Sequence, residues 1–235
     1  MDINAYRQET MGQSAVRQNA FINRVYAWMT AGLACTGIIA YFIGMQNPQT
    51  LSRLMPWMMP LLIVELVVVI ALSWGINRLS AAAATVLFFF YAGLNGVTLS
   101  VIFLAYELGS IAKVFFITTA TFGAMSAIGY TTKRDLSGLG SFLFMGLIGL
   151  IIAGIINAFW YSSQADLVIS FIGVLLFVGL TAYDTQKIKR MASACDEGEV
   201  DAEIVGKSSI IGALQLYLDF INLFLYLLRL MGRRR

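Results

Sequence analysis

The sequence predicts an all-α membrane protein with seven transmembrane helices, and three observations lead to this fold class. Hydrophobic residues make up 59% of the 235 positions and charged residues only 12%, which is too little polar surface for a water-soluble globule. Seven apolar stretches are long enough to cross a hydrocarbon core about 30 Å thick. All three prolines, Pro48, Pro56 and Pro60, lie in or just after the first connection, so no later helix carries a proline kink.

The expected spans follow one another closely and leave room for short connections only. They cover Tyr26–Gly44, Met55–Ile76, Ala81–Ala105, Ile111–Tyr130, Ser141–Trp160, Leu167–Tyr183 and Ser209–Leu230. A polar N-terminal segment, 1–25, and one charged loop before the last span make up most of the remainder. We therefore expect a single transmembrane domain over residues 1–235, without a separate soluble domain.

Charge placement favours a cytoplasmic N-terminus, and no cleaved signal is expected because the first residues lack an apolar core. Basic residues on the inner side would be Arg7, Arg17, Arg24, Arg78, Lys133, Arg134, Lys187, Lys189, Arg190 and Lys207. The outer loops would hold only Arg53 and Lys113. The tail 233–235 lies outside if the last segment crosses, and inside if that segment is re-entrant or only six helices cross. Its length favours a crossing, and the short loops favour a bacterial inner membrane.

Most enzyme chemistry is excluded by composition. The chain has no histidine, which removes Ser-His-Asp triads, HExxH zinc sites and histidine proton relays. Cys35 and Cys195 are expected neither to pair nor to hold a transition metal. There is no phosphate-binding glycine motif, and the basic residues are too scattered for nucleic acid. We expect no enzyme activity and no cofactor, and any ionic chemistry must use carboxylates.

The last helix carries a carboxylate where a carboxylate is expensive. One face of it collects the polar and small residues Ser208, Gly212, Gln215, Asp219, Asn222, Tyr226 and Arg229. An ionisable residue midway along a span indicates a functional site. The plainer interpretation is that Asp219 is a buried acid that hydrogen-bonds Gln215 or Asn222 on its own helix.

Other carboxylates lie within or beside the spans. Glu65 is near the middle of the second span, where we expect it to pair with a polar group on another helix or to be protonated. Glu107 and Asp166 are expected to be solvated charges at helix ends. The pair Asn95-Gly96 in the third span either marks a local unwinding or faces another helix.

Asp184 ends the sixth expected span, in the segment AYDTQKIKR. The plain interpretation is an interfacial carboxylate bridged to Lys187. Asp184 and Asp219 would face each other if the sixth helix continues past Lys189, because consecutive helices joined by a short loop are antiparallel neighbours. Two carboxylates in a low-dielectric site would share one proton, and they would also offer oxygen ligands to Ca²⁺.

These segments resemble the Bax inhibitor family, also called the lifeguard or transmembrane Bax-inhibitor-motif family. The similarity is carried by AYDTQKIKR and, most specifically, by LYLDFINLFLYLLRL near the end of the chain. It extends over RVYAWMTAGL, the glutamate-bearing second span, FYAGLNGVTLS and TKRDLSGLGSFLFMGLIGLIIAGIIN.

The resemblance implies a seven-helix bundle with the C-terminal helix at its centre and a pH-sensitive calcium leak, with cytoprotective roles in eukaryotic members. In such proteins the aspartates that match Asp184 and Asp219 form the proton-sensing latch. An arginine at the end of the second helix can pair with them, and Arg78 is the nearest match. Glu65, Gln215 and Asn222 are accessory candidates. We expect a monomer whose partners are the lipid bilayer, Ca²⁺ and protons.

Two other function classes remain open. Intramembrane aspartyl proteases also place an aspartate after a tyrosine in a sixth helix, as in Tyr183-Asp184. Their second motif is missing, because Tyr217-Leu218 precedes Asp219 and no Pro-Ala-Leu follows. A regulatory subunit that binds another membrane protein, such as a membrane protease, would need no site chemistry.

Overall fold

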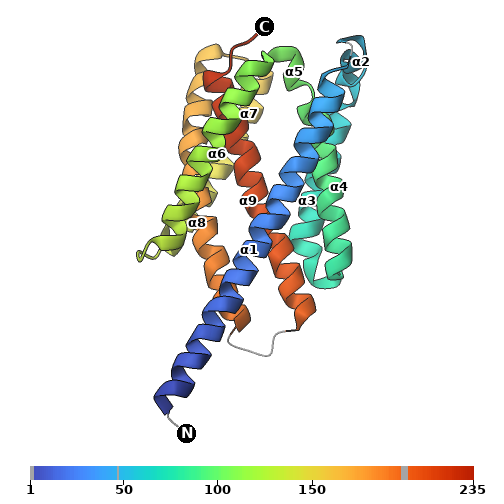
Figure 1. Cartoon of the computed structure of the whole chain (residues 1–235). Helices are drawn as coiled ribbons and strands as arrows, with labels where there is room; N and C mark the ends of the chain where they lie inside the picture. The colour runs from blue at the N-terminus through green and yellow to red at the C-terminus, as the bar shows by residue number, and fades with distance from the viewer. Residues whose placement is uncertain (1–2, 47, 197–200) are drawn as a thin grey trace. The chain divides into compact units, whose positions relative to one another are not determined.

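The structure is a computed structural model that describes residues 3–46, 48–196 and 201–235. Its helices are α1 (Ile3–Gly44), α2 (Pro48–Ser52), η1 (Met55–Trp57), α3 (Met58–Gly75), η2 (Ile76–Arg78), α4 (Ala81–Leu99), α5 (Ile102–Ala105), α6 (Leu108–Thr131), α7 (Ser137–Phe159), α8 (Ser163–Asp196) and α9 (Ala202–Met231) (Figure 1). Within the described residues, 7 helical segments are long and apolar enough to cross a membrane. This confirms the all-α membrane fold with seven spans.

Two helices extend well beyond the spans expected from hydropathy. The expected polar segment 1–25 is helical from Ile3 onward in α1, and residues 1–2 lie outside the described part of the chain. The sixth helix does not end at Tyr183, because α8 continues to Asp196. Hydropathy identifies only the apolar part of a helix that can lie in the membrane. The polar extensions of these two helices were therefore not predicted.

The third span is interrupted, but not at Asn95-Gly96. Both residues are buried inside α4, and a Cβ at Gly96 would lie 2.8 Å from the Thr36 carbonyl of α1. Gly96 therefore allows close backbone packing, as the helix-facing interpretation expected. The helix ends at Leu99; the N–H of the next residue, Ser100, is shared between the carbonyls of Gly96 and Val97, and α5 follows.

The chain divides into two compact units. Unit 1 comprises Met1–Ile102 and Lys187–Tyr217, and unit 2 comprises Phe103–Gln186 and Leu218–Arg235. Each unit is described by itself below. The expected single domain over 1–235 stays a prediction.

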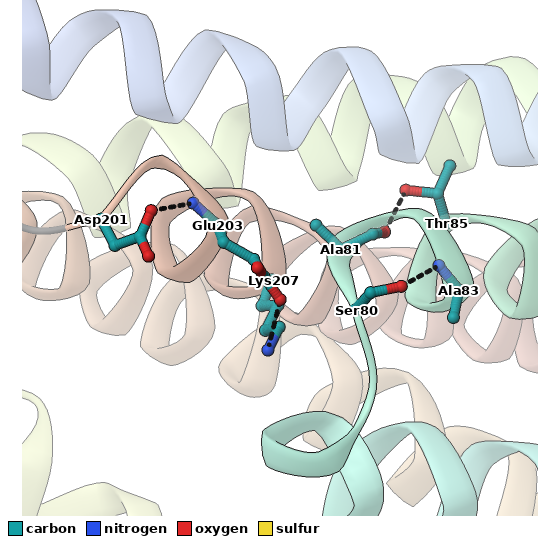
Figure 2. Close-up of polar contacts among 7 residues, drawn as sticks. All are labelled: Ser80, Ala81, Ala83, Thr85, Asp201, Glu203 and Lys207. Carbon is teal, nitrogen blue, oxygen red and sulfur yellow. Dashed lines mark hydrogen bonds and ion pairs between the residues drawn. The ribbon is translucent and has the colours of Figure 1, made fainter.

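Unit 1 is built on α4, which packs against α1 and α3. Figure 2 shows how α4 and α9 begin in this unit: the Ser80 hydroxyl accepts a hydrogen bond from the Ala83 N–H at 3.1 Å, and Asp201 accepts one from Glu203 at 3.1 Å. Such caps satisfy the free N–H groups of a first helical turn. A Cβ at Gly206 would lie 3.1 Å from that of Ala81, so the two helices start side by side.

Unit 2 contains α6, α7, most of α8 and the second half of α9. Glycines on α7 and α8 let these helices pack closely: a Cβ at Gly146 would lie 2.9 Å from Leu176, and one at Gly179 would lie 3.0 Å from Leu143. Small residues at helix contacts are the usual means of tight packing in lipid, where apolar burial gives little driving force.

The C-terminal helix α9 is the most enclosed of the spans, with 67% of its apolar window buried. In unit 1, Tyr217 of α9 is fully buried against Phe88 and Tyr91 of α4. In unit 2, Phe220 packs on Phe122 of α6. The enclosed C-terminal helix expected from the resemblance is therefore confirmed within each unit.

Candidate functional site

The two aspartates singled out by the sequence both lie in unit 2 and are both buried. Asp184 is on α8 with 9% relative exposure, and Asp219 is on α9 with 4%. Neither side chain faces the lipid. An acid in such a position is costly and is normally compensated by neighbouring groups or by a proton.

Direct ring packing joins α8 to α9 in this unit. The Phe177 and Tyr226 rings are stacked, with centroids 5.8 Å apart and planes at 25°. Gly173, one turn before Phe177, leaves room for the Tyr226 ring, because a Cβ there would come within 2.7 Å of it. These contacts fix which faces of the two helices meet.

The contact between Phe177 and Tyr226 also predicts how the two aspartates are placed relative to each other. Asp184 follows Phe177 by seven residues, and Asp219 precedes Tyr226 by seven residues. Seven residues make about two helical turns, or roughly 10 Å, and return to the same face within about 20°. Since α8 and α9 are antiparallel, both steps run in the same direction. The packing therefore predicts that both carboxylates lie in one layer on the facing sides of α8 and α9.

Contacts with α6 support the same placement independently. Thr185, which follows Asp184, is 3.4 Å from the Ser126 hydroxyl, and Phe220, which follows Asp219, packs on Phe122 with ring centroids 5.4 Å apart. Ser126 and Phe122 are one turn apart on α6. The residues next to the two aspartates thus contact a single turn of a third helix.

α6 and α8 approach each other closely beside this layer. A Cβ at Gly129 would overlap the Ala182 carbonyl, so only glycine fits here without moving one of the helices. Ala182 is two residues before Asp184. The backbone of α8 is therefore held tightly at the level of the candidate site.

Gln186 forms a clamp that the sequence analysis missed. Its amide donates to the Arg134 carbonyl and accepts from the Leu136 N–H, each at 2.8 Å, and the side chain is buried. Both partners are backbone groups of the connection between α6 and α7. Every residue has such backbone groups, so the sequence does not show which of them Gln186 binds. The only sequence signal at this position is the motif AYDTQKIKR, which contains Gln186.

The length of α8 changes the expected position of Asp184 and fulfils the condition set for its meeting with Asp219. Asp184 is inside α8 and not at the helix end, since the helix continues to Asp196. The condition for the two acids to meet, a sixth helix that continues past Lys189, is thus fulfilled. Its Lys187 and Lys189 can extend their stems toward water.

The donor set suits a proton or a passing cation better than a tightly held metal. Two carboxylates supply few of the 6–8 oxygens that Ca²⁺ prefers. Among the described residues, no group of ≥ 3 His, Cys, Asp or Glu side chains comes together as a metal site. A shared proton is the simplest way to lower the cost of two neighbouring buried acids.

The accessory candidates divide between the units. In unit 2, the Asn222 amide donates to the Leu218 carbonyl of its own helix at 2.8 Å. Gln215, Glu65 and Arg78 belong to unit 1. Gln215 Oε1 is buried without a hydrogen-bond partner in the described structure, and Arg78 is exposed at the end of η2. Their roles, including the latch role of Arg78, stay predictions.

Glu107 and Asp166 lie at helix ends with exposed and partly exposed side chains, and both are near arginines of the C-terminal tail, which the sequence analysis did not foresee. Arg233 pairs with Glu107 at 3.7 Å, and Arg234 and Arg229 pair with Asp166 at 3.7 and 3.9 Å. Backbone bonds join the tail to the residues before α6, including Glu107 N–H to the Arg233 carbonyl at 3.1 Å. Hydrogen bonds with Tyr161 and Tyr106 raise the pKa of Arg234 above its ordinary value, so this side chain stays charged.

Comparison with known proteins gives matches over nearly the whole chain. A family model described as "Inhibitor of apoptosis-promoting Bax1" matches residues 18–235. The inner membrane protein YbhL of Escherichia coli K12 is 47% identical over 234 residues, which cover 97% of this chain and 98% of the relative. Uncharacterized proteins of Borreliella burgdorferi and Deinococcus radiodurans are 42% and 43% identical, over 95% and 97% of this chain and 96% and 95% of their own lengths.

Proposed function

The chain belongs to the Bax inhibitor family of integral membrane proteins, and we propose that it is a pH-sensitive calcium leak gated by Asp184 and Asp219. In this proposal the chain conducts cations and catalyses no reaction. It acts as a monomer in a bacterial inner membrane, with the N-terminus in the cytoplasm.

The observation that supports the proposal is the stacking of α8 on α9 in unit 2, which predicts a common layer for the two buried acids. The stacked pair Phe177 and Tyr226 sets the register of α8 against α9, and each aspartate lies seven residues from it in the same direction. Both side chains are at most 9% exposed. A pair of acids in that position responds to pH without histidine, which the chain lacks.

The mechanism follows from the charge of the pair. At low pH a shared proton joins the two carboxyl groups and ties α8 to α9. At high pH both groups are ionised, repel each other and attract cations, because like charges in a low dielectric cannot remain together without compensation. Cation flux is therefore expected to change as the pair loses its proton.

The test is calcium flux into dye-loaded liposomes that contain the purified chain, measured in pH steps. Asp184→Asn and Asp219→Asn are each expected to abolish the flux or its pH dependence, and the double variant should add little to either. Glu203→Gln is the matched control, because it removes a half-exposed carboxylate that pairs with Lys207 on the same helix. This control should keep the wild-type profile.

Three results would reject the proposal. Flux that keeps its pH dependence in both aspartate variants would remove the pair from gating. Absence of flux at every pH, with cleavage of a helical peptide, would favour an aspartyl protease. Absence of both activities, with stable capture of another membrane protein, would favour a regulatory subunit.

A further inference from the structure

A second buried acid lies in unit 1, in a polar cluster that the proposed leak does not use. Glu65 of α3 is 7% exposed, contacts Thr98 of α4 and lies within electrostatic reach of Tyr91, which accepts a hydrogen bond from Asn95; these three α4 residues are each at most 9% exposed. Thr98 Oγ1 is 2.8 Å from Glu65 Oε1, which confirms the expected pairing of Glu65 with a polar group on another helix.

This cluster has more acceptors than hydrogens. Thr98 Oγ1 lies within hydrogen-bond distance of two acceptors, Glu65 Oε1 at 2.8 Å and the Asn95 carbonyl at 3.0 Å. A hydroxyl has one hydrogen to donate. Asn95 Oδ1 is also buried and has no hydrogen-bond partner within the described structure. With an ionised Glu65, one of the two short Thr98 contacts would therefore lack a hydrogen of its own.

The groups around Glu65 do not supply a balancing charge. Tyr91 on α4 and Tyr217 on α9 lie within electrostatic reach and are neutral phenols, and Cys35 of α1 is close to Tyr217. Arg78 of η2 is exposed, and across the described residues no ion pair links Glu65 to a lysine or arginine. An ionised carboxylate enclosed in this way would be costly.

We propose that Glu65 is a second proton-binding site of the chain, a neutral carboxylic acid that donates its hydrogen to Thr98 Oγ1. Thr98 then donates to the Asn95 carbonyl, and both short contacts are satisfied by one added proton. The acid joins α3 to α4 without placing a charge in the membrane. The site is separate from Asp184 and Asp219, which belong to unit 2.

A proton fits this site better than a metal ion. The cluster has a single carboxylate, and the remaining oxygens come from two hydroxyl groups, an amide and a backbone carbonyl. Calcium takes 6–8 oxygen ligands and usually several carboxylates, whereas a proton needs one donor and one acceptor at about 2.5–3.0 Å. Binding at Glu65 should therefore be insensitive to Ca²⁺.

Infrared spectroscopy of the full chain in vesicles tests the proposal. With glutamate carboxyl groups labelled with carbon-13, a protonated glutamic acid gives a carbonyl band that the label shifts, while aspartic acids are not shifted. We expect this band at neutral pH, with and without Ca²⁺, and expect Glu65→Gln to abolish it. Glu107→Gln is the control, because Glu107 is half exposed and paired with Arg233.

Variants of Thr98 give a second readout if Glu65→Gln fails to fold. Thr98→Val removes the acceptor and should shift the acid band, whereas Thr98→Ser keeps the hydroxyl and should leave it in place. Absence of a labelled acid band in the wild-type chain, or its persistence in Glu65→Gln, would overturn the proposal. Neither result depends on calcium flux, so the leak and this site fail separately.

Discussion

The contact of Gly129 with the Ala182 carbonyl can be tested by adding one methyl group. In Gly129→Ala the new Cβ would overlap a backbone atom of α8, which cannot rotate away as a flexible side chain can. Extra volume in a packed core costs about 1–3 kcal/mol. Alanine in place of glycine gains about 1 kcal/mol of helix propensity in water-soluble hosts, which partly offsets the cost.

Gly123 is the matched control on the same helix, because a Cβ there meets nothing within 4 Å. Gly123→Ala should therefore gain the helix propensity of alanine without any cost from overpacking. Both glycines have ordinary negative φ angles, so neither substitution strains the backbone. The propensity gain is common to both variants, so they should differ by the overpacking cost alone, about 1–3 kcal/mol in free energy of unfolding, with Gly129→Ala the less stable.

The measurement is reversible unfolding of the purified chain in mixed micelles, followed by tryptophan fluorescence. Gly129→Ala should also alter the pH profile of calcium flux, because Ala182 lies half a turn from Asp184. Equal stability of the two variants would refute the close approach of α6 to α8. If Gly129→Ala is destabilised but its flux keeps the wild-type pH profile, the contact between α6 and α8 stabilises the fold without affecting gating.

Three further predictions use the same micelle assay. Gln186→Leu should lose about 1–3 kcal/mol, because two backbone groups of the α6–α7 connection lose their partners, and an unchanged midpoint would contradict the clamp. Asp166→Asn should cost about 0.2–1 kcal/mol at low salt and less at high salt, since its pairs with Arg229 and Arg234 are partly exposed; a loss independent of salt would rule out an ionic origin. Thr36→Val and Tyr217→Phe should be coupled by about 0.6 kcal/mol in a double-mutant cycle, because their hydroxyls are 2.7 Å apart; additive losses would argue against that bond.

The number of spans could be predicted from sequence, because the bilayer imposes a minimum length of apolar helix. Their ends could not. α1 and α8 continue as polar helices beyond the hydrophobic stretch, where helix formation no longer depends on hydropathy. The extension of α8 matters most, since it moves Asp184 from a helix end to a helix interior.

The site was only partly predictable for a similar reason. Asp184 and Asp219 stand out because a carboxylate in an apolar span is expensive. The expectation that they share one layer depends on the Phe177 and Tyr226 stack, and a contact between distant residues cannot be predicted from a single sequence. The Gln186 clamp binds backbone atoms, and the acid partners of the tail arginines lie more than 60 residues away along the chain.

The pairing of the tail arginines changes how charge counts relate to topology. Arg233 and Arg234 each lie beside a carboxylate of the same unit, and Arg229 shares one of these acids. A positive charge that is neutralised by its own fold contributes little to retention on the cytoplasmic face. The basic tail is therefore compatible with translocation, and reporter domains fused to the two ends of the chain should be found on opposite sides of the membrane.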